Sequence, residues 1–516
     1  MLWGVLALAV LLLFWSLGGR YLWQDEAETA LLAKSILKSG LPIASDGTNV
    51  VSQETGREFD ADFLWRLSPW MQFYIASASI GLLGPTPLAA RLPFALLGFL
   101  SLPTVYVLSR KLFDSVDVAR LSALYMALSV PFLLHARQAR WHSPAYLLLV
   151  ILLISVLSLA RGEHLSLVVL VVSGSLLFYT NYFIAIGALL ALLIAAPLLE
   201  QGSRFVKNLL IAFLAIGILT LPGMIFFRVF AKGGGINVAR AVTQLWGYVG
   251  SYLTFLIPLP MLGLICYLLV EKSRFGLREE WKRRVWFLLS FSLVYIVYLS
   301  LAPWAMFRYL SILIPVQAVL LGAGTSWIMR QSRLAGVSVL MVIAFTNALH
   351  LTPLAFLKTP GTRSADRFPS VGPVSFPFFG YLYELTHTFD DPEKVLCHYL
   401  KAHAGPKDVV LITYGDLPLQ FCLGLRVVGG LQGQRPPMSP DWIILRQFAI
   451  STDPGKDYDV LRFIYTQINP NPYKRVSLPS RDSMLGNNPD PTFHLFRMPG
   501  NAPPLTLLRR QRDQDQ

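Results

Sequence analysis

Two adjacent carboxylic acids are the residues of this chain whose position is best suited to chemistry. Asp25 and Glu26 stand together in YLWQDEAETA, directly after a first apolar stretch. A carboxylate can act as a general base on an attacking hydroxyl group, which typically contributes about 10²–10⁴-fold to a rate. Because successive helical residues point about 100° apart, we expect only one of the two acids to face a substrate. The alternative for Asp25 is that it caps a helix expected over residues 26–38.

Isolated arginines next to apolar stretches form the second group of candidates. Arg91 lies in PLAARLPF, Arg137 and Arg140 lie in HARQARWHS, and Arg308 lies in PWAMFRYL. Arginine binds phosphate through parallel N–H donors, so these residues are candidates for holding an anionic substrate. For each of them the alternative is that the side chain extends to the lipid headgroups from a helix end.

The elements that must position these residues are those of an integral membrane protein. Hydrophobic residues make up 54% of the 516 residues and charged residues 14%, against about 25% charged residues in average soluble domains. Apolar stretches predict about eleven transmembrane helices, near residues 2–19, 88–109, 119–136, 143–160, 165–181, 183–199, 208–230, 248–270, 286–303, 309–328 and 334–353. The first stretch lacks the features of a cleaved signal peptide, so we expect it to remain as an anchor.

The positive charge of the chain predicts its orientation in the membrane. The formal net charge is +14, and the lysines and arginines lie mostly in short clusters at alternate ends of successive apolar stretches. That distribution is typical of the positive-inside rule rather than of a nucleic-acid-binding face. It predicts a cytoplasmic amino terminus and a periplasmic carboxyl-terminal region in a bacterial inner membrane. The shorter apolar run at 69–83 is expected to lie at the interface; a full span there is the alternative.

The predicted fold class is therefore a polytopic α-helical membrane protein with a C-terminal periplasmic α/β domain. Residues 1–353 would form the catalytic membrane domain, with a first outer loop at 20–87 that contains interfacial helices. Residues 354–516 would form the soluble domain. Its strands are expected at 408–414, 425–429, 441–446, 473–478 and 492–498.

Cysteines and metal ligands give weaker signals. Cys397 and Cys422 could form a disulfide in an oxidising compartment or remain two buried thiols, and both alternatives stay open. The histidines lack the spacing of a zinc site. No cofactor is certain, and a divalent cation held by carboxylates of the first outer loop is left open.

The order of these motifs resembles the GT-C superfamily of membrane glycosyltransferases, especially the branch with protein O-mannosyltransferases and lipid A aminoarabinose transferase. In that family an Asp-Glu pair follows the first span, as Asp25 and Glu26 do here. A small-small-Arg-Leu step resembles residues 89–92, and an Arg-Tyr pair before a proline-containing span resembles Arg308 and Tyr309. The resemblance covers the membrane part and extends to YGDLPLQFCLGLRVVGG near the carboxyl end.

The resemblance implies an inverting glycosyltransferase of the cell envelope that moves a monosaccharide from a polyprenyl-phosphate donor to a glycolipid, lipid A or a protein. Asp25 would be the general base, and Glu26 would orient another group. The donor phosphate would be bound by arginines: Arg91, Arg137, Arg140 and Arg308, with Arg66 replacing a cation of a Lys-Pro-Pro-Leu step that this chain lacks. Aromatic residues would contact the donor sugar or lipid: Tyr309, Tyr179, Tyr182 and Trp304.

Other functions remain open. The four aromatic residues could instead form an interfacial belt. A lipid or polysaccharide transporter or flippase would be expected to carry polar residues at mid-membrane and an internal repeat, and we find neither pattern in the sequence. An oligosaccharide ligase is a second enzyme alternative. The expected partners are the lipid-linked donor, the acceptor and the bilayer, without nucleic acid.

Overall fold

The structure is a computed structural model that describes residues 2–163, 165–232, 235, 237–271, 278–352, 374–446, 460–483 and 486–511. The chain divides into two compact units, each assembled from segments that are distant in sequence. The helical unit comprises Met1–Trp15, Phe94–Leu382 and Pro489–Thr492. The sheet unit comprises Ser16–Pro93, Tyr383–Asn488 and Phe493–Gln516. The predicted first outer loop thus belongs to the same unit as the C-terminal sheet. The boundary expected at residue 353 falls outside the described residues.

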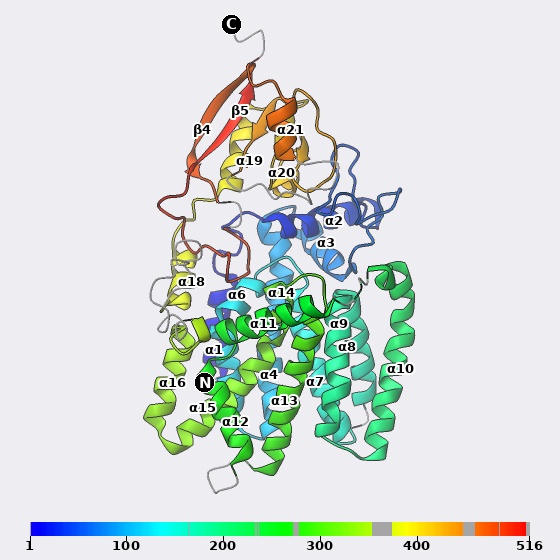
Figure 1. The fold of residues 1–516 in the computed structure, drawn as a ribbon, viewed down its shortest axis with the longest axis vertical. Helices are drawn as coiled ribbons and strands as arrows, with labels where there is room; N and C mark the ends of the chain where they lie inside the picture. The colour runs from blue at the N-terminus through cyan, green and yellow to red at the C-terminus, as the bar shows by residue number, and fades with distance from the viewer. Residues whose placement is uncertain are drawn as a thin grey trace. The chain divides into compact units, whose positions relative to one another are not determined.

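Helices make up the described part of the helical unit (Figure 1). α7 packs against α8, and α8 packs against α9 and α10, while α5 packs against α15, which is distant in sequence. The elements are α1 (Leu2–Phe14), α4 (Pro87–Phe113, which begins in the sheet unit), α5 (Val116–Leu128), α6 (Val130–Ala136), α7 (His142–Ala160), α8 (Ser166–Thr180), α9 (Tyr182–Ala195), η1 (Ala196–Leu198), α10 (Ser203–Phe226), η2 (Val229–Lys232), α11 (Val238–Phe255), α12 (Leu259–Val270), α13 (Glu279–Ser300), α14 (Phe307–Leu310), η3 (Ser311–Leu313), α15 (Ile314–Gln331), α16 (Arg333–Phe345) and α18 (Pro377–Thr386).

Five described helices are long and apolar enough to cross a membrane: α4, α7, α10, α13 and the run from α14 through α15. The number rises to seven if two bent pairs each count as one span, α5 with α6 at 65° and α11 with α12 at 99°. The other predicted spans correspond to shorter apolar helices, namely α1, α8, α9 with η1, and α16. Every predicted span therefore coincides with a helix or a bent pair.

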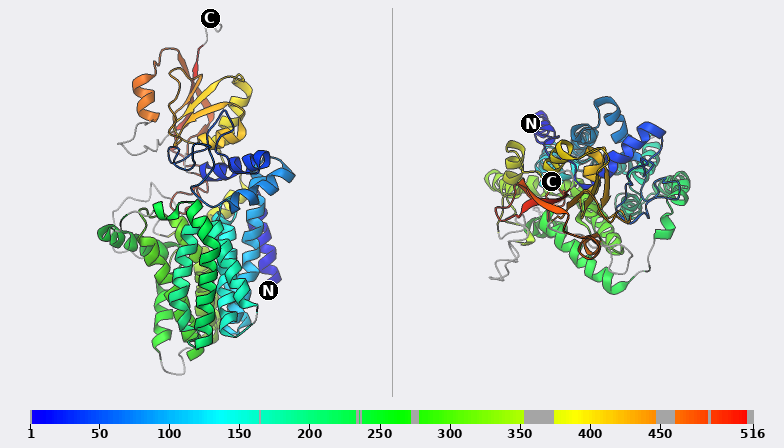
Figure 2. Two further views of the ribbon diagram at one scale, coloured as in Figure 1. Left: turned by 90° about the vertical axis from the view of Figure 1, so that its right-hand side faces the viewer. Right: turned by 90° about the horizontal axis from the view of Figure 1, so that it is seen from above.

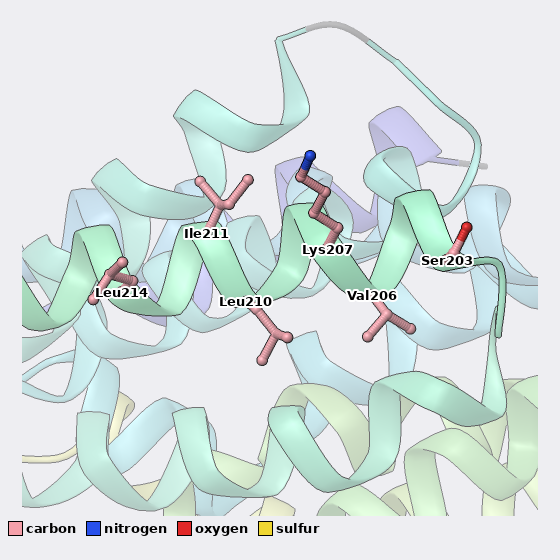
Figure 3. Close-up of a pocket in the computed structure, with 6 residues that line it drawn as sticks. All are labelled: Ser203, Val206, Lys207, Leu210, Ile211 and Leu214. Carbon is pink, nitrogen blue, oxygen red and sulfur yellow. The ribbon is translucent and has the colours of Figure 1, made fainter.

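One face of α10 exposes a continuous row of apolar side chains. Leu210 and Leu214 are 55% and 66% exposed, and Ile218 and Ile225 continue the same apolar face. Near the start of α10 the side chains of Ser203, Val206, Lys207, Leu210, Ile211 and Leu214 line an open groove (Figure 3). An apolar face of this extent is unfavourable in water and is typical of a helix that contacts lipid.

The sheet unit contains a five-stranded mixed sheet in the order β2-β1-β3-β5-β4. Its strands are β1 (Val409–Ile412), β2 (Arg426–Gly429), β3 (Trp442–Ile444), β4 (Tyr473–Arg481) and β5 (Pro504–Arg510). β1 pairs in parallel with β2 and β3, whereas β5 pairs antiparallel with β3 and β4. The strand expected at 492–498 is wrong, because the last strand is β5.

Side chains that alternate along the strands bury both faces of this sheet. Val410 and Ile412 of β1 pack with residues of α19 (Pro392–His403) and α20 (Asp416–Cys422). Leu411, between them, packs on the other face with residues of α21 (Val460–Gln467). Figure 2, left, shows the sheet between α21, in orange, and the two yellow helices. A small α/β domain at the carboxyl end, as the sequence predicts, is confirmed.

A disulfide joins α19 to α20 on one face of the sheet. Cys397 of α19 is bonded to Cys422 of α20, with a Cα–Cα distance of 6.3 Å. The alternative of two free thiols at these positions is therefore wrong. The bridge holds α20 in place, and the first residue of α20 is part of the site described below.

Residues 16–93 complete the sheet unit with α2 (Gln24–Ser39) and α3 (Met71–Leu83). α2 packs against α3 and against α20. After α2, the Asn49 side chain donates to the Leu425 carbonyl at 2.9 Å and accepts from the Val427 backbone N–H at 2.8 Å. The segment is thus bonded to the sheet at β2.

Candidate active site

The adjacent acids lie in the first turn of α2, and they are held differently. The helix begins at Gln24 with Trp23 as its N-cap, so the alternative that Asp25 caps the helix is wrong. Glu26 fills the position that closes a capping box, with its carboxylate 3.4 Å from the backbone N–H of Trp23. Asp25 is 7% exposed, and Glu26 has no exposed surface.

Arg91 binds Glu26 and the chain segment that precedes α2. Its Nε and Nη2 donate to the two carboxylate oxygens of Glu26 at 2.7 and 2.6 Å. Its remaining N–H groups donate to main-chain carbonyls at 2.8–3.0 Å, those of Leu17, Arg20 and Tyr21. A phosphate would have to displace one of these five bonds. The geometry therefore fits a positioning role better than the expected phosphate contact.

A further set of buried charges holds the segment before α2 in the sheet unit. Arg20 donates to the carbonyls of Leu495 and Gly486 and lies 3.2 Å from the Glu384 carboxylate. The backbone N–H of Tyr21 donates to Asp391 at 2.5 Å. The chain that leads to Asp25 is consequently fixed at several points.

Three carboxylates interact electrostatically with Tyr414, two residues after the end of β1. Burial raises the pKa of Tyr414, and the negative charges of Asp25, Asp416 and Glu393 raise it further. The Asp416 carboxylate accepts from the side-chain amide of Gln24 at 2.8 Å. Burial raises the pKa of Asp416 to about 6. Residues of the C-terminal part of the chain therefore act on Asp25 electrostatically and on its neighbour Gln24 by a hydrogen bond, which the sequence did not predict.

Arg446 completes this acidic cluster with one positive charge. Its Nη1 donates to Glu393 at 2.9 Å and its Nε to Asp482 at 2.7 Å, and its side chain is fully buried. Burial raises the pKa of Glu393 to about 7, although the charge of Arg446 opposes that rise. A fully buried charge is tolerated only with such partners.

The arginines of the helical unit fall into two kinds. Arg137 donates through Nη1 to the carbonyls of Leu12 and Trp15 at the end of α1, each at 2.9 Å. It thereby supplies partners for the end of a helix. Arg140 and Arg308 both act electrostatically on His142, at the start of α7.

The surroundings of Arg140 and Arg308 are the best candidate for an anion site in the helical unit. The ring of His142 lies 4.5 Å from that of His135, centroid to centroid. Trp141 stacks on Tyr309, next to Arg308, at 5.9 Å. The charge of Arg308 also acts on Asp490. Sequence reasoning set the two histidines aside because it tested them only for metal-ligand spacing.

The aromatic candidates are brought together only in part. The ring of Phe183 contacts the rings of Tyr309 and Trp304, with centroid-to-centroid distances of 5.0 and 6.4 Å. Tyr182 accepts from Lys232 at 3.3 Å, whereas Tyr179 donates to the Leu219 carbonyl at 2.9 Å. The contact made by Tyr179 joins α8 to α10 and accounts for its polar group without a substrate.

Arg66, which was expected to replace a missing cation, forms an ion pair with Asp60 six residues earlier in the chain. Among the residues that the structure describes, no group of three or more histidines, cysteines, aspartates or glutamates is arranged to hold a metal ion.

Comparison with solved structures identifies the fold. Crystal structures of ArnT, lipid A aminoarabinose transferase, from Cupriavidus metallidurans match with a TM-score of 0.58, in the apo state and bound to undecaprenyl phosphate. The matches cover 98% of this chain and 97% of ArnT, at 13% and 12% sequence identity respectively. The oligosaccharyltransferase AglB from Archaeoglobus fulgidus, in complex with an inhibitory peptide and a dolichol-phosphate, gives a TM-score of 0.45 at 13% identity, over 83% of this chain and 64% of AglB. No family model and no curated protein sequence matches the chain.

The fold is thus of the kind that the sequence motifs led us to expect. The likeness of fold between this chain and ArnT extends over nearly the whole length of both chains. The reaction that the protein catalyses has to be inferred from the side chains of the site.

Proposed function

We propose that this protein is an inverting glycosyltransferase that moves a monosaccharide from a polyprenyl-phosphate donor to an acceptor at the periplasmic face of a bacterial inner membrane. The observation that carries the proposal is the whole-length likeness of fold to ArnT, which has been crystallised with undecaprenyl phosphate. The acceptor would be a glycolipid, lipid A or a protein. The eleven-span topology predicted from the sequence is part of the proposal.

Asp25 would act as the general base. It would take the proton of the acceptor hydroxyl group while the hydroxyl oxygen forms a bond to the anomeric carbon. The bond from that carbon to the phosphate oxygen would break on the opposite side, which inverts the configuration. The leaving polyprenyl phosphate keeps the electron pair of the broken bond, so it requires stabilisation of negative charge rather than a proton.

Arg140 and Arg308 would supply that stabilisation. Both charges act electrostatically on His142, which supports the proposal that they bind the donor phosphate beside its ring. Trp141 and Tyr309, stacked next to Arg308, would offer a flat surface to the sugar or to the first isoprene units.

The test is a transfer assay with the full-length protein in nanodiscs that contain a polyprenyl-phosphate sugar and an envelope acceptor extract. Mass spectrometry should detect the glycosylated acceptor and an equal amount of released polyprenyl phosphate. Asp25→Asn should abolish transfer while donor binding is retained, because the change removes basicity and little volume. Turnover by Asp25→Asn equal to that of the wild type would exclude Asp25 as the base.

A control distinguishes the proposed transferase from the two alternatives. A flippase would move the intact donor across the bilayer without releasing polyprenyl phosphate. An oligosaccharide ligase would release a lipid diphosphate from a different donor. Either result, with no monosaccharide transfer, would contradict the proposal.

A further inference from the structure

One contact in the sheet unit joins the C-terminal domain to the residue beside the candidate base. The side-chain amide of Gln24, the first residue of α2, donates to Oδ1 of Asp416 at 2.8 Å. The side-chain amide of Gln432 donates to Oδ2 at 2.6 Å. Gln24, Asp416 and Gln432 are all buried. Both oxygens of the carboxylate thus have amide donors, and one of these donors precedes Asp25 directly.

The backbone around Asp416 is shaped to accommodate its carboxylate. Gly415 has a φ of +90° and leads from β1 into α20. Gly430 has a φ of +54°, and a Cβ atom on it would lie only 2.0 Å from Oδ1 of Asp416. A side chain at either position would be strained, and at position 430 it would also clash with the carboxylate. The loop that contains Gly430 therefore leaves room for the acidic group, whereas a Cβ atom on Gly415 would lie 3.1 Å from Nη1 of Arg446.

The contact acts on the first turn of α2. Asp25 is the second residue of the helix, so its orientation follows from the orientation of that turn. Arg91 and Glu26 hold the turn on one side, and Asp416 holds Gln24. A displacement of about 1 Å in a reacting group can cost on the order of 10²-fold in rate.

We infer that Asp416 is a positioning residue for Asp25, so that the C-terminal domain orients the general base through Gln24. This inference rests on the proposed function, in which Asp25 takes the acceptor proton. It assigns the C-terminal domain a part in the chemical step. Asp416 itself need not touch the substrate.

A double-mutant cycle in the full-length protein tests the contact. Gln24→Glu places a second carboxylate against Asp416, and the repulsion should displace the first turn of α2 and lower kcat by about 10- to 100-fold. Adding Asp416→Asn to the same chain should recover much of that loss. The amide introduced at position 416 can donate to the carboxylate introduced at position 24, while its own carbonyl accepts from Gln432. The KM for the donor should stay within about twofold in all variants, since the residues proposed to bind the donor phosphate, Arg140 and Arg308, are not changed.

Asn49→Ser is the matched control. It removes two buried hydrogen bonds between the segment 16–93 and β2, in the same unit, without touching the first turn of α2. We expect Asn49→Ser to lower thermal stability and to leave kcat per folded molecule unchanged. If Gln24→Glu lowers kcat no more than Asn49→Ser does, or if Asp416→Asn brings no recovery, the inference is wrong.

Hydrogen exchange at the amides of residues 24–28 separates this inference from the proposed function. Exchange there should be faster in Gln24→Glu than in the wild type and in Asn49→Ser, and slower again in the double variant. This result does not depend on turnover. A wild-type protein without transferase activity would refute the proposed function, whereas unchanged exchange in Gln24→Glu would refute the positioning by Asp416.

Discussion

Glu26 and Arg91 form a buried ion pair joined by two hydrogen bonds, and 65 residues of chain separate them. The pair links the first turn of α2 to the start of α4. The two adjacent acids have different surroundings, since Glu26 is bound to a cation inside the protein while the charge of Asp25 acts on Tyr414. Glu26 therefore holds the first turn of α2 in place, and in the proposed mechanism Asp25 acts as the base.

Substitution of Arg91 should lower the stability of the folded protein rather than its affinity for the donor. Arg91→Ala leaves the Glu26 carboxylate buried without its cation, which costs about 3–5 kcal/mol in comparable pairs. The expected result is a lower melting temperature and little folded protein, measured by fluorescence-detected size exclusion. Arg91→Lys should recover only part of the stability, because one ammonium group cannot replace five directed donors. A well-folded Arg91→Ala protein with weakened donor binding would show instead that Arg91 binds phosphate.

Arg308→Ala and Arg140→Ala should behave in the opposite way. The proteins should fold normally, bind a polyprenyl-phosphate donor about 10- to 100-fold more weakly and turn over more slowly, because a charge-assisted contact to phosphate is lost in the ground state and in the transition state. Binding is measured with a fluorescent donor analogue in nanodiscs. Arg137→Ala is the matched comparison, since Arg137 contacts the end of α1. Equal donor affinity in all three variants would refute the assignment of the phosphate site.

The sequence predicted the types of residue that matter but not which of them pair with each other. Arg91 and Arg308 look alike in the sequence, since each stands at the start of an apolar helix. Their surroundings differ because Glu26 and three carbonyls enclose Arg91, and these partners are brought together only by the tertiary fold. The composition and length of the apolar stretches were sufficient for the helices, since lipid allows few other structures.

The C-terminal domain shows where local pattern was insufficient. Alternation of apolar residues favoured a strand at 492–498, but both ring nitrogens of His494 have partners there, the Glu384 carboxylate and the Asn488 carbonyl. In the structure the segment contains no strand. The buried network of Glu393, Arg446 and Asp482 was missed for the same reason, because its members are distant in sequence and each looks like an ordinary surface residue.

Loss of the disulfide should weaken the sheet unit. The bridge closes a loop of 25 residues, and in the chain-entropy model it contributes about 3 kcal/mol. Cys422→Ser with Cys397→Ser should make the C-terminal domain more susceptible to limited proteolysis at elevated temperature. Cys266→Ser, which changes a cysteine outside the bridge, is the control. Equal proteolysis rates in the two proteins would mean that the bridge adds little stability.

The contribution of Glu393 to the stability of the sheet unit should fall as the pH rises from about 4.5 to about 7. Burial raises the pKa of Glu393 from 4.5 to about 7 in the folded protein. In this window the folded state retains a proton that the unfolded state has lost, so the contribution is complete below pH 4.5 and is lost as the pH rises through 7. Asp416, whose pKa rises from 3.8 to about 6, acts in the same direction at slightly lower pH.

Glu393→Gln isolates this contribution, because the amide can still accept a hydrogen bond from Arg446 but does not titrate. The variant should show a flatter decline in stability between pH 5 and pH 7.5 than the wild type, by up to about 3 kcal/mol. Hydrogen exchange of β1 and β3 amides at several pH values measures the difference within the intact protein. Glu54→Gln, a change of an exposed carboxylate in the same unit, should leave the profile unchanged. Parallel profiles for Glu393→Gln and the wild type would show that Glu393 is ionised in the folded protein at pH 5, with Arg446 outweighing the cost of its burial.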